Sequence, residues 1–138
     1  MAIINMQTMR YINLLTRVSR VRTTHCFLYN NTIIFAVPRP LIRKAVGGSG
    51  KNIKELQKTI GKRVKIIGEV RGPQDLERFI QDLVDPATFK SVDINGEQII
   101  INSGNRTKAA TLIGRNKIRL DELAKIIMDV FGKELKII

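Results

Sequence analysis

Apolar side chains near the start of the chain recur with the period of a helix. In the segment 8–19 they return every three or four positions, which predicts an amphipathic helix. The segments 22–28 and 32–37 are instead rich in β-branched and aromatic residues and predict two strands. Between them Asn30 and Asn31 tolerate positive φ, so we expect a tight turn that makes the two strands antiparallel.

The pattern returns to helical spacing after Pro38 and Pro40, which cannot continue a strand. A short helix is predicted over 41–46 and a second one over 51–60, and a strand follows over 62–67. The order predicted for this half is therefore α-β-β-α-α-β, with a glycine-rich turn between the last two helices.

The same order starts again after a break at Gly72 and Pro73, within the predicted linker 69–74. The elements predicted for this half are a helix over 74–84, strands over 89–94 and 98–102 around an Asn95-Gly96 turn, and a helix over 105–113.

An internal repeat supports two copies of one unit. GGSGKNIKEL from Gly47 aligns without a gap on GRNKIRLDEL from Gly114, and GKRVKII from Gly61 matches GKELKII from Gly132. Between these blocks the second copy has four more residues, so its last helix should be about one turn longer. We predict two domains, residues 1–70 and 71–138, of α+β class.

Positive charge is concentrated in the first half. The 138 residues carry 24 Lys and Arg against 12 Asp and Glu, a formal net charge of +12. Residues 1–73 hold fourteen of the basic residues with only Glu55 and Glu69 as acids, whereas residues 74–138 are balanced. Solvated surface charge does not require acids to be nearly absent from one half, so this distribution favours a polyanionic partner.

The glycine-rich turn carries the candidate chemistry. Gly47 and Gly50 lack a β-carbon, so the backbone can turn sharply and approach a sugar-phosphate chain. The free N–H groups of the following helix face an anion there, and Ser49 and Lys51 add a hydroxyl donor and a charge.

With these residues and this order of elements, the chain resembles the type II KH family. The resemblance implies that each domain has a three-stranded sheet with helices packed on one face, and that the Gly-x-x-Gly loop holds the backbone of about four nucleotides of single-stranded RNA. It also implies an apolar groove beside the loop for the bases, for which Ile42, Val46 and Ile53 are candidates, although core packing explains Ile53 better. The other predicted RNA-binding residues of this copy are Gly47, Gly48, Ser49, Gly50, Lys51, Arg43, Lys44 and Lys54, with Lys58 as nearby charge.

The second copy departs from the motif, because Lys117 stands where Gly50 stands in the first. Its β-carbon puts the loop geometry of residues 114–117 in question. The cationic side chains there still suit phosphates, so both a retained site and a structural relic stay open. The predicted residues of this altered site are Gly114, Arg115, Asn116, Lys117 and Arg119.

Two such domains joined by a short linker resemble the archaeal form of the NusA family of transcription factors. That resemblance implies binding of nascent RNA in transcription elongation or termination, with RNA polymerase as a second candidate partner and a monomer expected. A ribosome-associated or rRNA-maturation protein would share the same fold, charge and loop, and a single-stranded DNA binder is a less favoured alternative.

Other classes of protein fit the sequence poorly. The Gly48-Ser49-Gly50-Lys51 segment lacks the first glycine and the Ser or Thr of a Walker A motif, so we expect no enzyme and no cofactor. Cys26 and His25 are the only residues of their types and are expected to be ordinary strand residues with no metal site. Since no apolar run is long enough to span a bilayer and no leader is recognisable, we expect a cytoplasmic protein without membrane contact.

Overall fold

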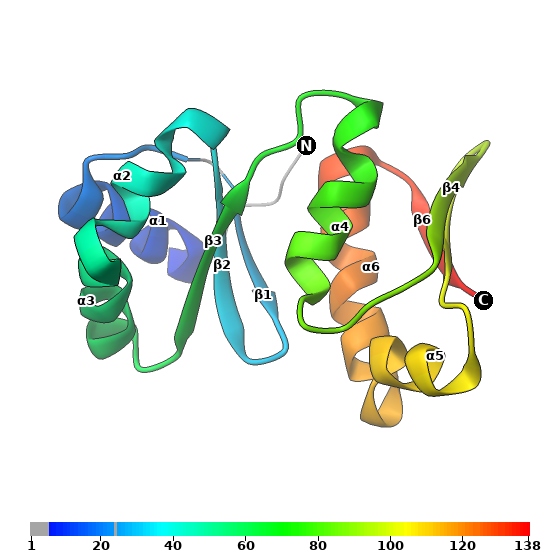
Figure 1. Cartoon of the computed structure of the whole chain (residues 1–138). Coiled ribbons are helices and arrows are strands. Elements are labelled where there is room, and N and C mark those ends of the chain that lie inside the picture. Colours follow the sequence, from blue (N-terminus) through cyan, green and yellow to red (C-terminus); the bar gives the residue numbers. More distant parts are fainter. Residues whose placement is uncertain (1–5, 24) are drawn as a thin grey trace. The chain divides into compact units, whose positions relative to one another are not determined.

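The chain folds into two compact units, one ending at Glu69 and the other beginning at Val70 (Figure 1). The structure is a computed structural model that describes residues 6–23 and 25–138. Within these residues each unit has three α-helices and three strands in the order α-β-β-α-α-β. The predicted class, an α+β fold of two tandem type II KH-like units, is confirmed.

Short 3₁₀ turns precede several of the helices in both units. The elements of the first unit are α1 (Met6–Ser19), β1 (His25–Tyr29), β2 (Thr32–Val37), η1 (Arg39–Leu41), α2 (Ile42–Val46), η2 (Gly48–Gly50), α3 (Lys51–Ile60) and β3 (Arg63–Gly68). The elements of the second unit are η3 (Pro73–Asp75), α4 (Leu76–Val84), β4 (Ser91–Asn95), β5 (Gln98–Asn102), α5 (Arg106–Ile113), η4 (Arg115–Lys117), α6 (Ile118–Phe131) and β6 (Glu134–Ile137).

Both sheets are mixed and have the same topology. In the first, β1 and β2 are antiparallel around the turn Asn30-Asn31, and β3 joins β2 in parallel with Ile33 opposite Val64. In the second sheet β4, β5 and β6 repeat this order. A parallel pair needs a long crossover connection, and in each unit this connection is made by two helices and the turn between them.

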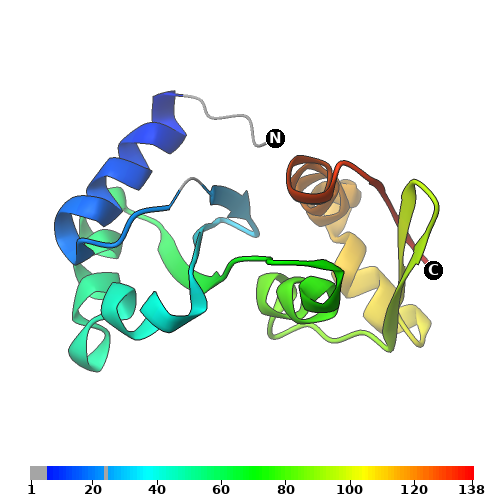
Figure 2. The same ribbon diagram turned by 90° about the horizontal axis from the view of Figure 1, so that it is seen from above.

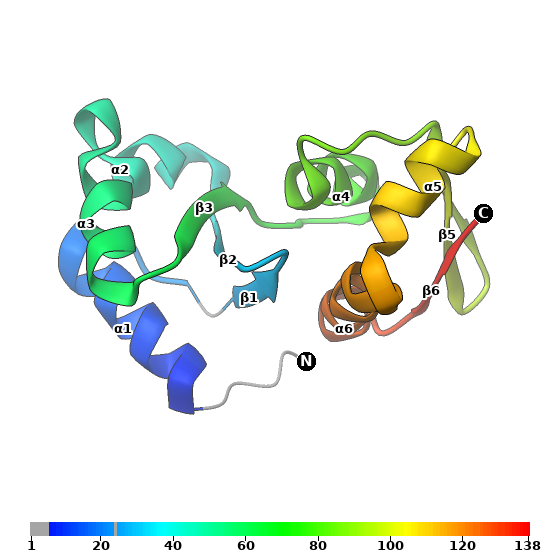
Figure 3. The same ribbon diagram turned by 90° about the horizontal axis from the view of Figure 1, so that it is seen from below.

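The helices of the first unit cover one face of its sheet. Figures 2 and 3 show α1, α2 and α3 on the same side of the strands. Phe35 of β2 is fully buried there against Leu15 of α1, Ala45 of α2 and Leu56 of α3. These contacts fix the two helices whose ends form the glycine-rich turn, and Figure 3 shows that turn projecting from the unit.

The second unit is built in the same way with a longer last helix. Ile99 and Ile101 of β5 are fully buried, and α4 and α6 meet through Phe79 and Phe131, whose ring centroids lie 5.9 Å apart in an edge-to-face arrangement. Helix α6 has 14 residues where α3 has 10, which confirms the predicted extra turn.

Local capping explains where the observed elements differ from the predicted ranges. β1 begins at His25 and not at Arg22, because α1 ends at Ser19 with Arg20 in a left-handed conformation (φ 61°) and Val21 turns into the core, 1% exposed. Thr23 then donates its hydroxyl to the Ala36 carbonyl before the strand pairing starts.

Smaller shifts follow the same logic in the second unit. The helix predicted from Gln74 starts with a 3₁₀ turn at Pro73, and α4 proper begins at Leu76. The strand predicted from Phe89 starts at Ser91. Asn105 is the N-cap of α5, since its side-chain oxygen accepts the Lys108 N–H at 2.8 Å.

Leu56 should be the residue on α3 whose loss most weakens the first unit. It is fully buried, so Leu56→Ala should lower the free energy of unfolding by about 2–5 kcal/mol. Lys58→Ala on the exposed side of the same helix should change it by less than about 0.5 kcal/mol. Urea denaturation followed by circular dichroism measures both, and equal effects would contradict the packing described for α3.

Candidate nucleic-acid interface

The turn between α2 and α3 has an unusual backbone. Gly47 has φ 82° and ψ 162°, Ser49 has φ 56° and ψ 26°, and Gly50 has φ 74° and ψ 21°. Three of the four residues of the Gly-x-x-Gly loop therefore have positive φ, a region that residues with a β-carbon seldom adopt. The chain reverses sharply here and enters α3 at Lys51.

Backbone hydrogen bonds hold this turn together. The Gly47 N–H donates to the Arg43 carbonyl at 2.9 Å and so ends α2, and the Gly50 N–H donates to the Gly47 carbonyl at 3.1 Å. Asn52 adds a side-chain bond across the turn, from its Nδ2 to the Lys44 carbonyl at 3.1 Å. The amide of Asn52 thus ties the first turn of α3 to the last turn of α2.

The second copy adopts the same turn despite its lysine. Gly114 has φ 76° and ψ 172°, Asn116 has φ 56° and ψ 26°, and Lys117 has φ 61° and ψ 22°. The Gly114 N–H donates to the Ala110 carbonyl at 2.9 Å, and the Lys117 N–H donates to the Gly114 carbonyl at 3.2 Å. The altered motif therefore keeps its loop geometry, which answers the question that Lys117 raised.

The bond across the turn is also repeated, with a different side chain. Arg119, at the position equivalent to Asn52, donates from Nη1 to the carbonyl of Thr111 at 3.2 Å, and Thr111 is equivalent to Lys44. A guanidinium has five N–H donors, so this bond uses only one of them. Sequence reasoning placed Arg119 in the site as a phosphate ligand and gave no sign of this second role.

The two glycines of the first motif serve different purposes. A β-carbon added at Gly47 would lie 2.9 Å from Cγ of Asn52, whereas one added at Gly50 would meet no atom within 4 Å. Gly47 is thus required by both its backbone angles and the space around it. At Gly50 only the left-handed conformation favours glycine. A residue with a β-carbon in this conformation costs about 1–2 kcal/mol, and Lys117 has this cost in the second copy.

Most predicted ligands of the first loop are exposed around the turn. Gly47 and Gly50 are half-buried, and the exposed residues are Gly48, Ser49, Lys51, Arg43, Lys44, Lys54 and Lys58. In the second copy Gly114 and Arg119 are half-buried, while Arg115, Asn116 and Lys117 are exposed. Each turn therefore presents cations and backbone N–H groups to solvent at the start of a helix.

The apolar candidates for a base-binding groove divide into two kinds. Ile42 and Ile53 are half-buried and pack against the core of the first unit, together with Leu56, which is fully buried. Val46, on the last turn of α2 beside the loop, is half-buried. Ile42 and Ile53 thus use part of their surface for core packing, whereas Val46 lies beside the loop outside that core cluster.

Arg39 is a cation whose position the sequence pattern did not reveal. Its side chain lies over Gly68 at the end of β3, where an added β-carbon would come within 2.6 Å of Nη1. Its Nη2 is buried and has no hydrogen-bond partner among the described residues.

The lone cysteine and histidine lie on β1, as expected. Burial raises the pKa of the Cys26 thiol to about 12, so the thiol stays protonated at neutral pH. The His25 ring lies 6.1 Å from the Phe27 ring, centroid to centroid. Over residues 6–23 and 25–138, no three His, Cys, Asp or Glu side chains gather as metal ligands would, and no helix there has the length and apolar character needed to cross a bilayer.

The fold and the paired turns define a protein of two tandem KH-like units. Both units together are similar to a solved structure. The chain resembles the crystal structure of APE1850 with a TM-score of 0.69, over 98% of this chain and 100% of that one. The sequence identity is 23%, so the likeness shows the fold alone. No protein-family model matches the chain, and no curated protein does.

The unequal roles of the two glycines can be tested directly. Gly50→Lys copies the second unit and should cost about 1–2 kcal/mol of unfolding free energy with the native circular dichroism retained. Gly47→Ala should cost about 3 kcal/mol, because alanine is strained at these angles and its β-carbon would collide with Asn52. Urea denaturation of both variants measures the difference, and a larger loss from Gly50→Lys would refute this description of the turn.

Proposed function

We propose that this chain is a single-stranded RNA-binding protein in which each turn between paired helices holds a stretch of RNA backbone. The proposal rests above all on one observation. The turns at residues 47–50 and 114–117 have closely similar backbone angles and an equivalent cross-helix bond, although their side chains differ. A loop that binds the RNA backbone depends on its own backbone shape more than on its side chains, and the two turns share that shape although their side chains differ.

The charge of the two units supports an anionic ligand. In the first unit the loop is flanked by Arg43, Lys44, Lys51 and Lys54, which are all exposed. In the second unit the loop itself carries cations where the first carries small residues. Phosphates bind well to such side chains together with the N–H groups at a helix start. We therefore propose that both turns contact RNA, the second mainly through charge.

The setting we propose is transcription, on the basis of the resemblance to the archaeal form of NusA. In this role the protein would bind nascent RNA as a monomer in the cytoplasm and contact RNA polymerase. Binding, without chemical conversion of the RNA, is the proposed activity.

The central test replaces the exposed middle of the first loop. A β-carbon at Gly48 would enter open space, and Asp tolerates the left-handed angles of Ser49, so Gly48→Asp with Ser49→Asp should leave the fold intact. Two carboxylates against the phosphates should weaken binding to a short single-stranded RNA at least tenfold. Fluorescence anisotropy measures this, and circular dichroism checks the fold; unchanged affinity in a folded variant would refute the loop assignment.

Two matched comparisons sharpen the result. Arg115→Asp with Asn116→Asp changes the equivalent positions of the second loop and should weaken binding by a smaller factor. Double-stranded RNA and single-stranded DNA of the same sequence should bind the wild type more weakly than single-stranded RNA. Stronger binding to DNA would favour the single-stranded DNA alternative, and equal binding to all three would mean that the charge acts without selectivity.

Salt should weaken binding steeply. For single strands the logarithm of affinity falls with the logarithm of salt concentration by about 0.7 per neutralised phosphate. About four phosphates at one turn therefore predict a slope near −3 for an RNA too short to reach the second turn. Anisotropy titrations between about 50 and 200 mM salt measure the slope. A flat response would exclude phosphate contacts as the main source of affinity.

A further inference from the structure

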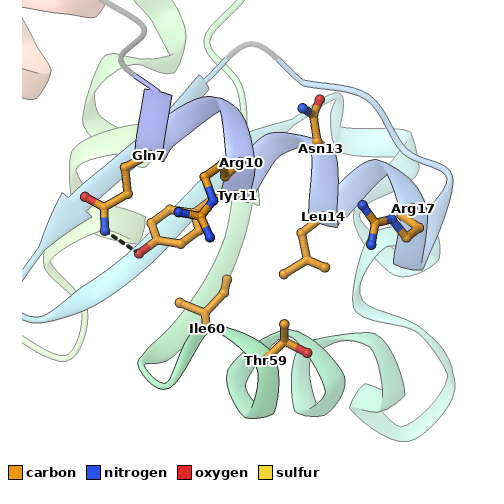
Figure 4. A pocket seen from close by; sticks show the side chains of 8 residues that line it. All are labelled: Gln7, Arg10, Tyr11, Asn13, Leu14, Arg17, Thr59 and Ile60. Atoms are coloured by element: carbon orange, nitrogen blue, oxygen red, sulfur yellow. Dashed lines mark hydrogen bonds between the residues drawn. The ribbon is translucent and has the colours of Figure 1, made fainter.

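A groove that is not part of the RNA contacts proposed for the loop runs between α1 and α3 of the first unit. Its volume is about 460 Å³, and it lies at the last turn of α3, where Thr59 and Ile60 line it. Figure 4 shows side chains of α1 and α3 facing one another across it. None of the described residues that line it is acidic.

The groove combines an apolar floor with two exposed cations. Tyr11, Leu14 and Ile60 line it and also pack against the core of the unit, so the floor is fixed. Arg10 and Arg17 also line it and are exposed, seven residues or about 10 Å apart along α1.

A side-chain hydrogen bond holds the Tyr11 ring in place. Gln7 donates from Nε2 to the Tyr11 hydroxyl at 2.8 Å, and this bond orients the ring at the edge of the groove. A nucleobase can stack on an aromatic ring, and guanidinium groups bind phosphates in forked geometry. The groove thus offers one surface for a base and two groups for the phosphates on either side of it.

We propose that this groove binds a nucleotide of the same RNA strand that the loop at residues 47–50 holds. This inference rests on the proposed function. The loop and the groove lie on opposite ends of α3, separated by nine residues or about 13 Å of helix, a gap that a few nucleotides span. An acidic peptide would also be attracted by the arginines, but the shared helix and the oriented Tyr11 ring favour RNA.

The test compares RNAs that reach the groove with RNAs too short to do so. Oligouridylates of five and ten nucleotides are titrated by anisotropy against wild type, Arg10→Ala with Arg17→Ala, and a control, Arg22→Ala with Arg63→Ala. The control removes the same charge from two exposed arginines of the same unit that do not line the groove. The groove variant should bind the ten-nucleotide RNA about tenfold more weakly and the five-nucleotide RNA less than twofold more weakly, while the control should show no dependence on length.

The outcomes separate this inference from the proposed function. If the groove variant loses equal affinity for both lengths, or none, the groove is not part of the RNA path. If Gly48→Asp with Ser49→Asp leaves binding of the five-nucleotide RNA unchanged, the loop assignment fails instead. Tighter binding of a glutamate- and leucine-rich peptide, lost in the groove variant while both RNAs bind normally, would replace RNA by a protein partner and overturn the proposal.

A spectroscopic measurement reports on Tyr11 directly. The chain has no Trp and two Tyr, so Tyr29→Phe leaves Tyr11 as the only tyrosine fluorophore. Stacking should quench its emission on addition of the ten-nucleotide RNA but not of the five-nucleotide RNA. Emission that does not change with the longer RNA at saturation would exclude base stacking in the groove.

Discussion

The parallel pairing of β2 with β3 is the constraint on which the first unit depends. With Ile33 opposite Val64, the chain must return along the whole sheet before β3 can pair, and a two-residue hairpin cannot make that connection. The return is made by α2, the turn at residues 47–50 and α3, which Leu56 anchors on the sheet. The exposed turn therefore follows from strand pairing, and the same pairing of β5 with β6 produces the second turn.

The two turns show which part of the motif sets its shape. Gly47 and Gly114 share angles that only glycine adopts easily, and an added β-carbon would collide in both cases with the side chain that crosses the turn. At the last position Gly50 and Lys117 have nearly the same angles in spite of their chemistry. The first glycine thus determines the turn, and the remaining positions are open to changes that alter what the turn presents to a ligand.

The sequence predicted correctly those features that depend on local residues or on the internal repeat. The repeat predicted the order of elements and the longer α6, and the Asn30-Asn31 turn predicted the first hairpin. It placed the start of β1 too early, because Arg20 and Val21 take their conformation from the end of α1 and from the core. The Arg119 bond and the groove beside Tyr11 depend on which helix faces which, and hydrophobic periodicity within one helix does not contain that information.

Lys117 in its left-handed conformation has a consequence for how the two copies can diverge. Its strain of about 1–2 kcal/mol is small against the roughly 5–15 kcal/mol of a typical domain, so a duplicated unit can exchange a glycine for a charge and stay folded. If both units bind one RNA strand as proposed, binding by one unit raises the local concentration of the strand at the other, to about the millimolar range for short flexible linkers. A second unit that binds too weakly alone would then still lengthen the residence time on the strand, so its motif could change at little cost to binding.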